Sequence, residues 1–303
     1  MDRNLKSLSM GWLPDYPDFR DYTVNQDTLS ERVKKFGEEK SISKMLGAIG
    51  VTKAAKSLPL KVSLKEWCSP IEDQESIGSC TAHAGVGLVE YFEKRAFGKH
   101  IDASRLFLYK TTRNLLNWIG DTGAFLRNTM GALVLFGVPP EEYWQYNVAD
   151  FDLEPSAFCY AYAQNYQAIS YYRLDSPGIS KDVLLTNIKK HLAAGLPSMF
   201  GFTVFNSISQ ANNTGLIPFP AKTDRISGGH AIVAIGYDDK LKIKNTFSAK
   251  ETTGALQIRN SWGESWGENG YGWLPYEYIL SDLAEDWWCI IKSEWVDTNA
   301  FKI

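Results

Sequence analysis

The stretch that decides the fold lies near the C-terminal end of the chain and reads Arg259-Asn260-Ser261-Trp262-Gly263-Glu264-Ser265-Trp266-Gly267. Two stretches upstream complete the pattern, Gln74-Glu75-Ser76-Ile77-Gly78-Ser79-Cys80 and Gly228-Gly229-His230-Ala231-Ile232-Val233. A thiol, an imidazole that enters an apolar run and an amide followed by tryptophan are the parts that a thiol nucleophile needs: attacker, base and orienting group. The sequence therefore predicts that Cys80, His230 and Asn260 meet at one site.

The predicted nucleophile opens a helix. After Cys80, apolar residues recur four positions apart, and Gly98 is a typical stop signal. Unpaired backbone N–H groups and the helix dipole favour a negative charge at a helix N-terminus. We therefore expect the pKa of the Cys80 thiol to be lowered.

In order and identity, the three blocks resemble those of the papain-like cysteine peptidases, with the closest likeness to their microbial branch, from about Leu58 to the C-terminus. The resemblance implies an α+β protein of two lobes with the site in the cleft between them. A mainly helical lobe would span about 58–165, and an antiparallel, β-barrel-like lobe would span about 166–303.

The resemblance also implies the chemistry. Cys80 would attack a peptide carbonyl and form a thioester, His230 would serve as acid and base, and Asn260 would orient the imidazole. Gln74 would point its amide into an oxyanion hole together with the backbone N–H of Cys80. The expected substrate is a peptide or protein, and neither a metal nor an organic cofactor is implied.

Three more residues receive roles from the resemblance. Trp262 and Trp266 would shield the bond between histidine and asparagine from water. Gly123, in the segment Asp121-Thr122-Gly123-Ala124, would line the edge that binds the substrate backbone. The side-chain preference of the site stays open.

The chain also departs from the family pattern. Ile77 stands where many relatives carry a cysteine, Thr81 replaces an aromatic residue, and Glu75 replaces a glycine. The loop before the nucleophile must therefore be held by packing. The polar stretch from Asp238 to Thr253 lengthens the interval between histidine and asparagine, and we expect it to form a surface hairpin.

Composition narrows the class of protein. The 303 residues carry a net charge of −3 and 44% hydrophobic residues, which is typical of a globular protein and argues against nucleic-acid and membrane-surface partners. The apolar runs are shorter than the roughly 20 residues that cross a bilayer. No secretory signal is evident at residues 1–13. The family precedent favours a secreted or lysosome-like compartment, so localisation stays open, as does oligomeric state.

Four cysteines, Cys68, Cys80, Cys159 and Cys289, are too few and too scattered for a disulfide scaffold, and they include no C-x-x-C pair. A structural zinc site is therefore discounted. If Cys80 stays free, at most one bridge can form, and Cys68 with Cys289 is the pairing we consider.

Secondary-structure signals divide the chain in two. Helical patterns follow Cys80, Ser104 and Gly123, whereas strand patterns dominate after Tyr160, beginning with 166–173 and interrupted by one helix after Ser180. Helices first and antiparallel strands later indicate an α+β protein.

Residues 1–57 differ from the rest. An opening rich in aromatic residues and proline, Gly11 to Tyr22, precedes charged helical patterns from Asp27 through Glu39 and after Ser41. This N-terminal extension suggests a zymogen-like, autoinhibitory segment ahead of a catalytic domain at 58–303. Two alternatives stay open: an acyl transferase or special amide hydrolase on the same triad, and a catalytically silent peptide-binding module whose cleft the extension fills.

Overall fold

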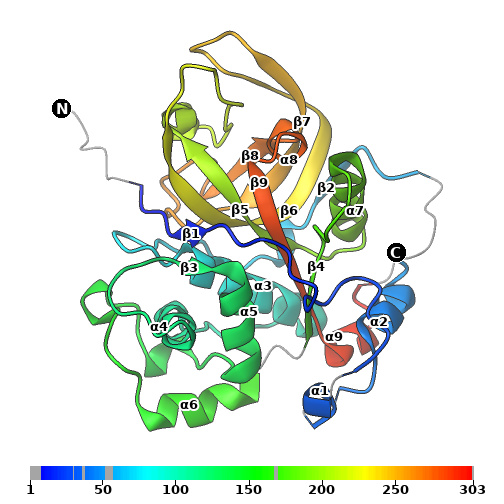
Figure 1. Ribbon diagram of the computed structural model, residues 1–303, viewed down its shortest axis with the longest axis vertical. Coiled ribbons are helices and arrows are strands. Elements are labelled where there is room, and N and C mark those ends of the chain that lie inside the picture. Colours follow the sequence, from blue (N-terminus) through cyan, green and yellow to red (C-terminus); the bar gives the residue numbers. More distant parts are fainter. Residues whose placement is uncertain (1–7, 30, 36–37, 52–56, 167–169, 302–303) are drawn as a thin grey trace.

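The computed structural model describes residues 8–29, 31–35, 38–51, 57–166 and 170–301. Helices gather at one end of the molecule and a twisted sheet at the other, so the chain forms the two lobes expected of an α+β protein (Figure 1). Strand β1 runs between the two lobes. Parts of two sequence predictions, residues 30 and 36–37 of the first helix and 167–169 of the first strand, lie outside the described residues.

The helical lobe is built from α3 (Cys80–Phe97), α4 (Arg105–Leu115), α5 (Leu126–Leu135) and α6 (Ala157–Ala163). The predicted start of α4 and the predicted end of α3 hold because a serine and a glycine cap these helices as expected, whereas α5 begins at Leu126, three residues after the predicted start at Gly123, because β3 takes up Ala124–Phe125. Ser104 accepts a hydrogen bond from the Phe107 N–H, and Gly98 ends α3 with φ +73°. Helix α6 continues past Tyr160, where we had expected the change to strands.

Seven strands form one antiparallel sheet. Along it run β4 (Ser170–Arg173), β9 (Ala284–Ile291), β5 (Ser198–Phe205), β6 (Ile226–Lys244), β7 (Glu251–Arg259) and β8 (Tyr271–Pro275), while β2 (Lys61–Ser63) also pairs with β6. In the described residues β4 and β8 do not pair, so the sheet does not close into the expected barrel-like form.

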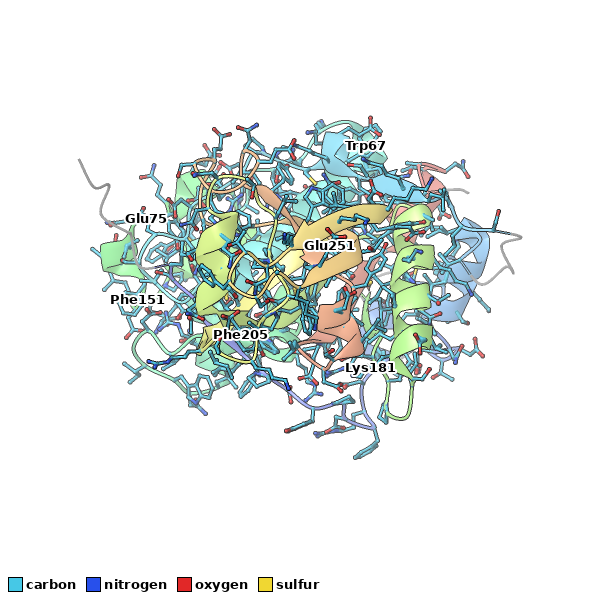
Figure 2. The ribbon with its side chains drawn as sticks, turned by 90° about the horizontal axis from the view of Figure 1, so that it is seen from above. Trp67, Glu75, Phe151, Lys181, Phe205 and Glu251 are labelled. Carbon is cyan, nitrogen blue, oxygen red and sulfur yellow. The ribbon has the colours of Figure 1, made fainter. Side chains whose placement is uncertain are left out.

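Helices cover the sheet. Ser180 caps α7 (Lys181–Ala193), which packs against β6, and α8 (Glu277–Leu280) follows β8. The predicted hairpin is confirmed, because Lys242 pairs with Thr253 and Lys244 with Glu251. It lies at the end of the molecule away from α4 and α6, and Figure 2, viewed from above, shows Glu251 on it near the centre of the view.

The N-terminal extension packs against both lobes. Strand β1 (Trp12–Leu13) pairs in parallel with β3 (Ala124–Phe125), and the backbone then reaches β4, where Arg173 N–H donates to Tyr22. Helix α1 spans Glu31–Lys35, Ser41 caps α2 (Ile42–Ile49) as predicted, and α2 packs against the C-terminal α9 (Ser293–Asp297). We call residues 8–23 the N-terminal arm.

Short 3-10 turns complete the described secondary structure: η1 (Lys65–Trp67), η2 (Glu141–Tyr143), η3 (Val148–Asp150), η4 (Gln164–Tyr166) and η5 (Asn206–Ala211). Among the helices that can be described, none is both long and apolar enough to span a bilayer.

Candidate active site

Cys80 begins helix α3 at the boundary between the lobes. Its Sγ atom lies 3.4 Å from the backbone N of Ala231, the residue that follows His230 in β6. The thiol is fully buried. The first stretch and the second are thus brought together, as the sequence predicts.

The expected lowering of the thiol pKa is wrong for this covered form of the site. Burial raises the pKa of Cys80 to about 12, because it removes water from the charged thiolate. Backbone N–H groups of Ala231, Thr81 and Trp12 oppose this rise without overcoming it. The helix terminus therefore acts in the expected direction, and desolvation outweighs it.

His230 is held by Asn260. The imidazole Nε2 lies 2.8 Å from Asn260 Oδ1, which also accepts a hydrogen bond of 2.8 Å from the Ser261 N–H. An atom that accepts from a backbone N–H is the amide oxygen, so Nε2 carries the ring proton. Nδ1 is then a lone-pair acceptor, and it has no hydrogen-bond partner among the described residues.

Burial lowers the pKa of His230 to about 4, although the bond to Asn260 favours the charged form. With the thiol pKa near 12, both groups are uncharged across the neutral range. The covered site therefore holds a thiol and a neutral imidazole rather than an ion pair.

Two tryptophans lie beside the imidazole of His230, where the first contacts the ring and the second contacts the first. Trp262 stacks on His230 with ring centroids 4.3 Å apart and an interplanar angle of 17°. Trp266 meets Trp262 edge to face, with centroids 5.3 Å apart. Both indoles are buried, so they keep water from one face of the ring.

Gln74 is fully buried and fixed at both ends of its amide. Oε1 accepts from the Ser261 hydroxyl at 2.7 Å, and Nε2 donates to the Ile77 carbonyl at 2.9 Å. One amide hydrogen remains for another acceptor. Ile77 is itself buried, so packing replaces the cysteine that the family pattern carries there.

The N-terminal arm passes directly over these groups. Trp262 Nε1 donates to the Ser9 carbonyl at 2.8 Å, Gly11 N–H donates to the Gly229 carbonyl at 3.1 Å, and the Trp12 N–H points to the Cys80 sulfur. A Cβ atom on Gly11 would lie 2.0 Å from the Gly78 carbonyl oxygen. Only glycine lets the arm approach this closely.

The segment at Gly123 contacts the backbone of the arm. Gly123 N–H donates to the Tyr109 hydroxyl, and the donor to the Gly11 carbonyl is Ala124, at 2.8 Å. Gly123 itself allows the close approach, because a Cβ there would lie 2.2 Å from the Gly11 oxygen. Within this segment, Ala124 provides the hydrogen bond to the arm.

The cysteine pairing we considered is wrong. All four cysteines are free and buried, and the Cys289 thiol contacts the hydroxyl of Tyr172 instead. Within the described ranges, no group of three or more His, Cys, Asp or Glu side chains is arranged to hold a metal ion.

Sequence reasoning missed two residues of the site. Ser261, which holds the Gln74 amide, follows Asn260 directly and could have been noted for that reason. Asp286 lies in β9, where its carboxylate accepts from the Trp12 indole at 3.2 Å. No motif surrounds Asp286, so the sequence carried no signal for it.

Comparisons with known proteins agree with this geometry. The family model described as papain family cysteine protease matches residues 58–291. An uncharacterized peptidase C1-like protein of Acanthamoeba polyphaga mimivirus is 31% identical, covering 96% of this chain and 89% of its own. The crystal structure of xylellain, a cysteine protease from Xylella fastidiosa, is 32% identical with a TM-score of 0.71, covering 96% of this chain and 98% of that one.

A more distant structure shares the fold. The Amb a 11 cysteine protease of ragweed pollen, solved in its proform, is 21% identical with a TM-score of 0.59, covering 80% of this chain and 69% of that one.

The chain belongs to the papain family of cysteine proteases. It is a cysteine peptidase that acts on peptide bonds, and neither acyl transfer nor a silent binding module is favoured by its relatives.

Proposed function

We propose that Cys80 is the nucleophile of this peptidase, that His230 is its acid and base, and that Asn260 orients the imidazole. The observation that carries the proposal is the 2.8 Å bond between His230 Nε2 and Asn260 Oδ1. This bond leaves Nδ1 of His230 free to accept a proton. The Cys80 sulfur lies 3.4 Å from the backbone N of Ala231, which follows His230 in β6.

The chemistry follows from this arrangement. The thiol proton moves to Nδ1, the sulfur attacks the peptide carbonyl carbon, and the imidazolium returns the proton to the leaving amine as the C–N bond breaks. Water then attacks the thioester, again giving a proton to Nδ1, and the acid and the thiol are released. The free hydrogen of Gln74 Nε2 and the Cys80 N–H would stabilise the oxyanion.

We further propose that residues 1–57 form an autoinhibitory segment ahead of a catalytic domain at 58–303. The contacts of Ser9, Gly11 and Trp12 support this, because they occupy the Trp262 indole N–H, the Gly229 carbonyl and the Cys80 sulfur. The arm brings the Trp12 N–H group to Cys80 and covers the proposed nucleophile.

The test uses the full chain and a peptidyl epoxide or vinyl sulfone that alkylates an active-site thiol. Gly11→Ala would displace the arm, because the added Cβ would lie 2.0 Å from the Gly78 oxygen. Gly131→Ala is the matched control, since its Cβ would meet only Leu115, at 3.8 Å. Cys80→Ala identifies the labelled thiol.

We expect rapid labelling of Gly11→Ala, slow labelling of the wild type and of Gly131→Ala, and none of Cys80→Ala. If no folded form is labelled, Cys80 is not the nucleophile. If the wild type is labelled as fast as Gly11→Ala, the arm does not inhibit.

A further inference from the structure

The hydroxyl of Tyr146 lies where the two ends of the loop before Cys80 meet. We call residues 74–79 the nucleophile loop. The hydroxyl oxygen is 2.9 Å from the Gln74 carbonyl oxygen and 2.7 Å from Ser79 Oγ. A carbonyl oxygen only accepts, so the single phenolic hydrogen goes to Gln74, and the Ser79 hydroxyl donates its own hydrogen to the tyrosine oxygen. One side chain therefore fastens both ends of the loop.

His83 supports this direction of the hydrogen bonds. Its Nδ1 lies 3.2 Å from the Ser79 carbonyl oxygen and 3.3 Å from Ser79 Oγ. Since the carbonyl only accepts, Nδ1 carries a hydrogen, and the Ser79 hydroxyl hydrogen is left for Tyr146. The His83 ring also meets the Tyr146 ring edge to face, with centroids 5.1 Å apart.

Burial keeps both rings in these protonation states. It lowers the pKa of His83 well below its ordinary 6.5, so the imidazole is neutral near pH 7. It raises the pKa of the Tyr146 hydroxyl above its ordinary 10, and the hydrogen bond to Ser79 opposes the rise. Tyr146 therefore keeps the hydrogen that it donates to Gln74.

The backbone of Tyr146 is fixed to the helical lobe. Its N–H donates to Glu141 Oε1 at 2.6 Å, and the nearby Trp144 carbonyl accepts from the Ser104 hydroxyl at 2.5 Å. Ser104 caps α4, which packs against α3, the helix that Cys80 begins. The position of the Tyr146 hydroxyl is thus set by the same lobe that carries the sulfur.

The nucleophile loop needs such a fastening. All four cysteines are free, so no disulfide holds it, and Glu75 has φ +54°, a conformation that residues other than glycine adopt at a cost. The loop also joins the two proposed oxyanion donors, Gln74 Nε2 and the Cys80 N–H. A shift of its ends would therefore change the distance between these donors.

We propose that Tyr146 is a positioning residue for the peptidase reaction, whose hydroxyl holds the Gln74 amide and the Cys80 N–H at the separation that the oxyanion requires. Tyr146 acts through Gln74 and Ser79 rather than on the substrate. This inference rests on the proposed functions of Cys80 and Gln74.

The test replaces Tyr146 by phenylalanine in the full-length Gly11→Ala enzyme. Tyr146→Phe keeps the ring against His83 and removes only the hydroxyl. We expect kcat to fall about 10-fold to 100-fold with KM nearly unchanged, because misplaced donors weaken binding of the transition state rather than of the substrate. Ser79→Ala removes the donor at the other end of the loop and should lower kcat in the same way. Normal kcat in both variants would overturn the inference.

Tyr91→Phe is the matched control. The Tyr91 hydroxyl also donates to a carbonyl, that of Gly195 at 2.9 Å, and accepts one hydrogen bond, from Arg95 at 2.7 Å. It lies about three turns further along α3 than Cys80. Its loss should leave kcat nearly unchanged. An equal fall in kcat for Tyr91→Phe and Tyr146→Phe would mean that Tyr146 only stabilises the fold.

Two inhibitors separate positioning from general structure. A peptide aldehyde adds to the Cys80 thiol: sulfur bonds to the carbonyl carbon, the proton goes to the oxygen, and this oxygen occupies the oxyanion site. Its inhibition constant should rise in Tyr146→Phe by about the factor lost in kcat. Alkylation by the peptidyl epoxide forms no such oxygen, so its rate should stay the same. Equal losses with both inhibitors would contradict a positioning role.

A double-mutant cycle with Gln74→Ala completes the test. If Tyr146 acts through this donor, Tyr146→Phe should cost clearly less kcat in the Gln74→Ala background, because the donor that it positions is already gone. Full additivity would contradict the inference. If the Gly11→Ala parent is not labelled at Cys80, the proposed function fails as well; a labelled and active parent with a normal Tyr146→Phe variant removes the inference alone.

Discussion

The indole of Trp262 lies flat on the imidazole of His230, with ring centroids 4.3 Å apart, while its Nε1 holds the Ser9 carbonyl of the arm. One side chain thus lies over the proposed catalytic base and also binds the segment that covers it. These two duties can be separated by substitution.

Trp262→Ala in the Gly11→Ala background should lower kcat about 10-fold, because water would reach the bond between His230 and Asn260. Trp262→Phe keeps a ring over the imidazole and should retain most of the activity. In the otherwise wild-type chain, both substitutions remove the donor to Ser9 and should speed labelling of Cys80. Equal kcat for alanine and phenylalanine would show that shielding is unimportant.

Gln74→Ala should lower kcat about 100-fold to 1,000-fold with little change in KM, because it removes the proposed side-chain donor to the oxyanion. Steady-state kinetics of the Gly11→Ala enzyme would measure both. Ser261→Ala serves as the comparison: it frees Oε1 of Gln74 without removing the donor, so the loss should stay within about 10-fold. A Gln74→Ala enzyme with normal kcat would remove this residue from the oxyanion hole.

Local signals explain what the sequence predicted well. The caps at Ser41, Ser104 and Ser180 and the stop at Gly98 act within a few residues, so these helix ends were predictable. The three stretches that contain Cys80, His230 and Asn260 were recognisable because each is a dense run of specific residues.

Non-local contacts explain what could not be predicted. The pairing of β1 with β3 joins two residues to two others more than 100 positions away, and neither pair has a strand pattern of its own. The contact between Asp286 and the Trp12 indole depends on a bulge between β5 and β9, and the high pKa of Cys80 depends on burial by the arm and the sheet. None of these is encoded in neighbouring residues.

Thiol reactivity should rise with pH over different ranges when the arm is in place and when it is displaced. In the covered form burial raises the pKa of Cys80 to about 12, so the thiolate forms only as pH approaches that value, and alkylation by iodoacetamide should be slow and rise steadily through the neutral range. In Gly11→Ala, rehydration lets the backbone N–H groups lower the thiol pKa, and the rate should level off at a lower pH. Identical profiles would contradict the link between the arm and the pKa.

Asp286→Asn should change how stability depends on pH. Burial raises the pKa of the Asp286 carboxyl to about 7 from an ordinary 3.8, and Arg173 opposes the rise while Asp175 reinforces it. The folded state therefore binds the proton more tightly, and the wild type loses stability as pH rises from about 4 to 7. Asparagine lacks this titration. Relative to the wild type, the free energy of unfolding of the variant should increase by on the order of 1 kcal/mol for each pH unit in that range.

Urea unfolding at several pH values would measure the difference. Glu264→Gln, at an exposed position, is the control. If the difference in free energy of unfolding between the wild type and Asp286→Asn stays constant from pH 4 to pH 8, the raised pKa is contradicted.

Arg127→Ala should loosen the arm. This arginine lies on α5 and bridges to the arm, with contacts of 2.7 Å to Asp15 and 2.9 Å to Asp21 and a hydrogen bond to the Tyr16 carbonyl. We expect labelling of Cys80 to speed up several-fold, with a smaller gain at high salt, where these pairs are already screened. Arg20→Ala is the control, because Arg20 is exposed and pairs only locally with Asp18. If Arg127→Ala and Arg20→Ala speed the labelling equally, the ion pairs of Arg127 do not hold the arm in place.

The arm and the groups it covers belong to one continuous chain, and this has a kinetic consequence. A tethered segment meets its site at an effective concentration on the order of millimolar, whatever the amount of enzyme in solution. Severing the tether between the arm and Leu58 would convert this into an ordinary bimolecular equilibrium, in which the freed peptide diffuses away on dilution. Activation would then run in one direction, and each molecule would switch on independently of its neighbours.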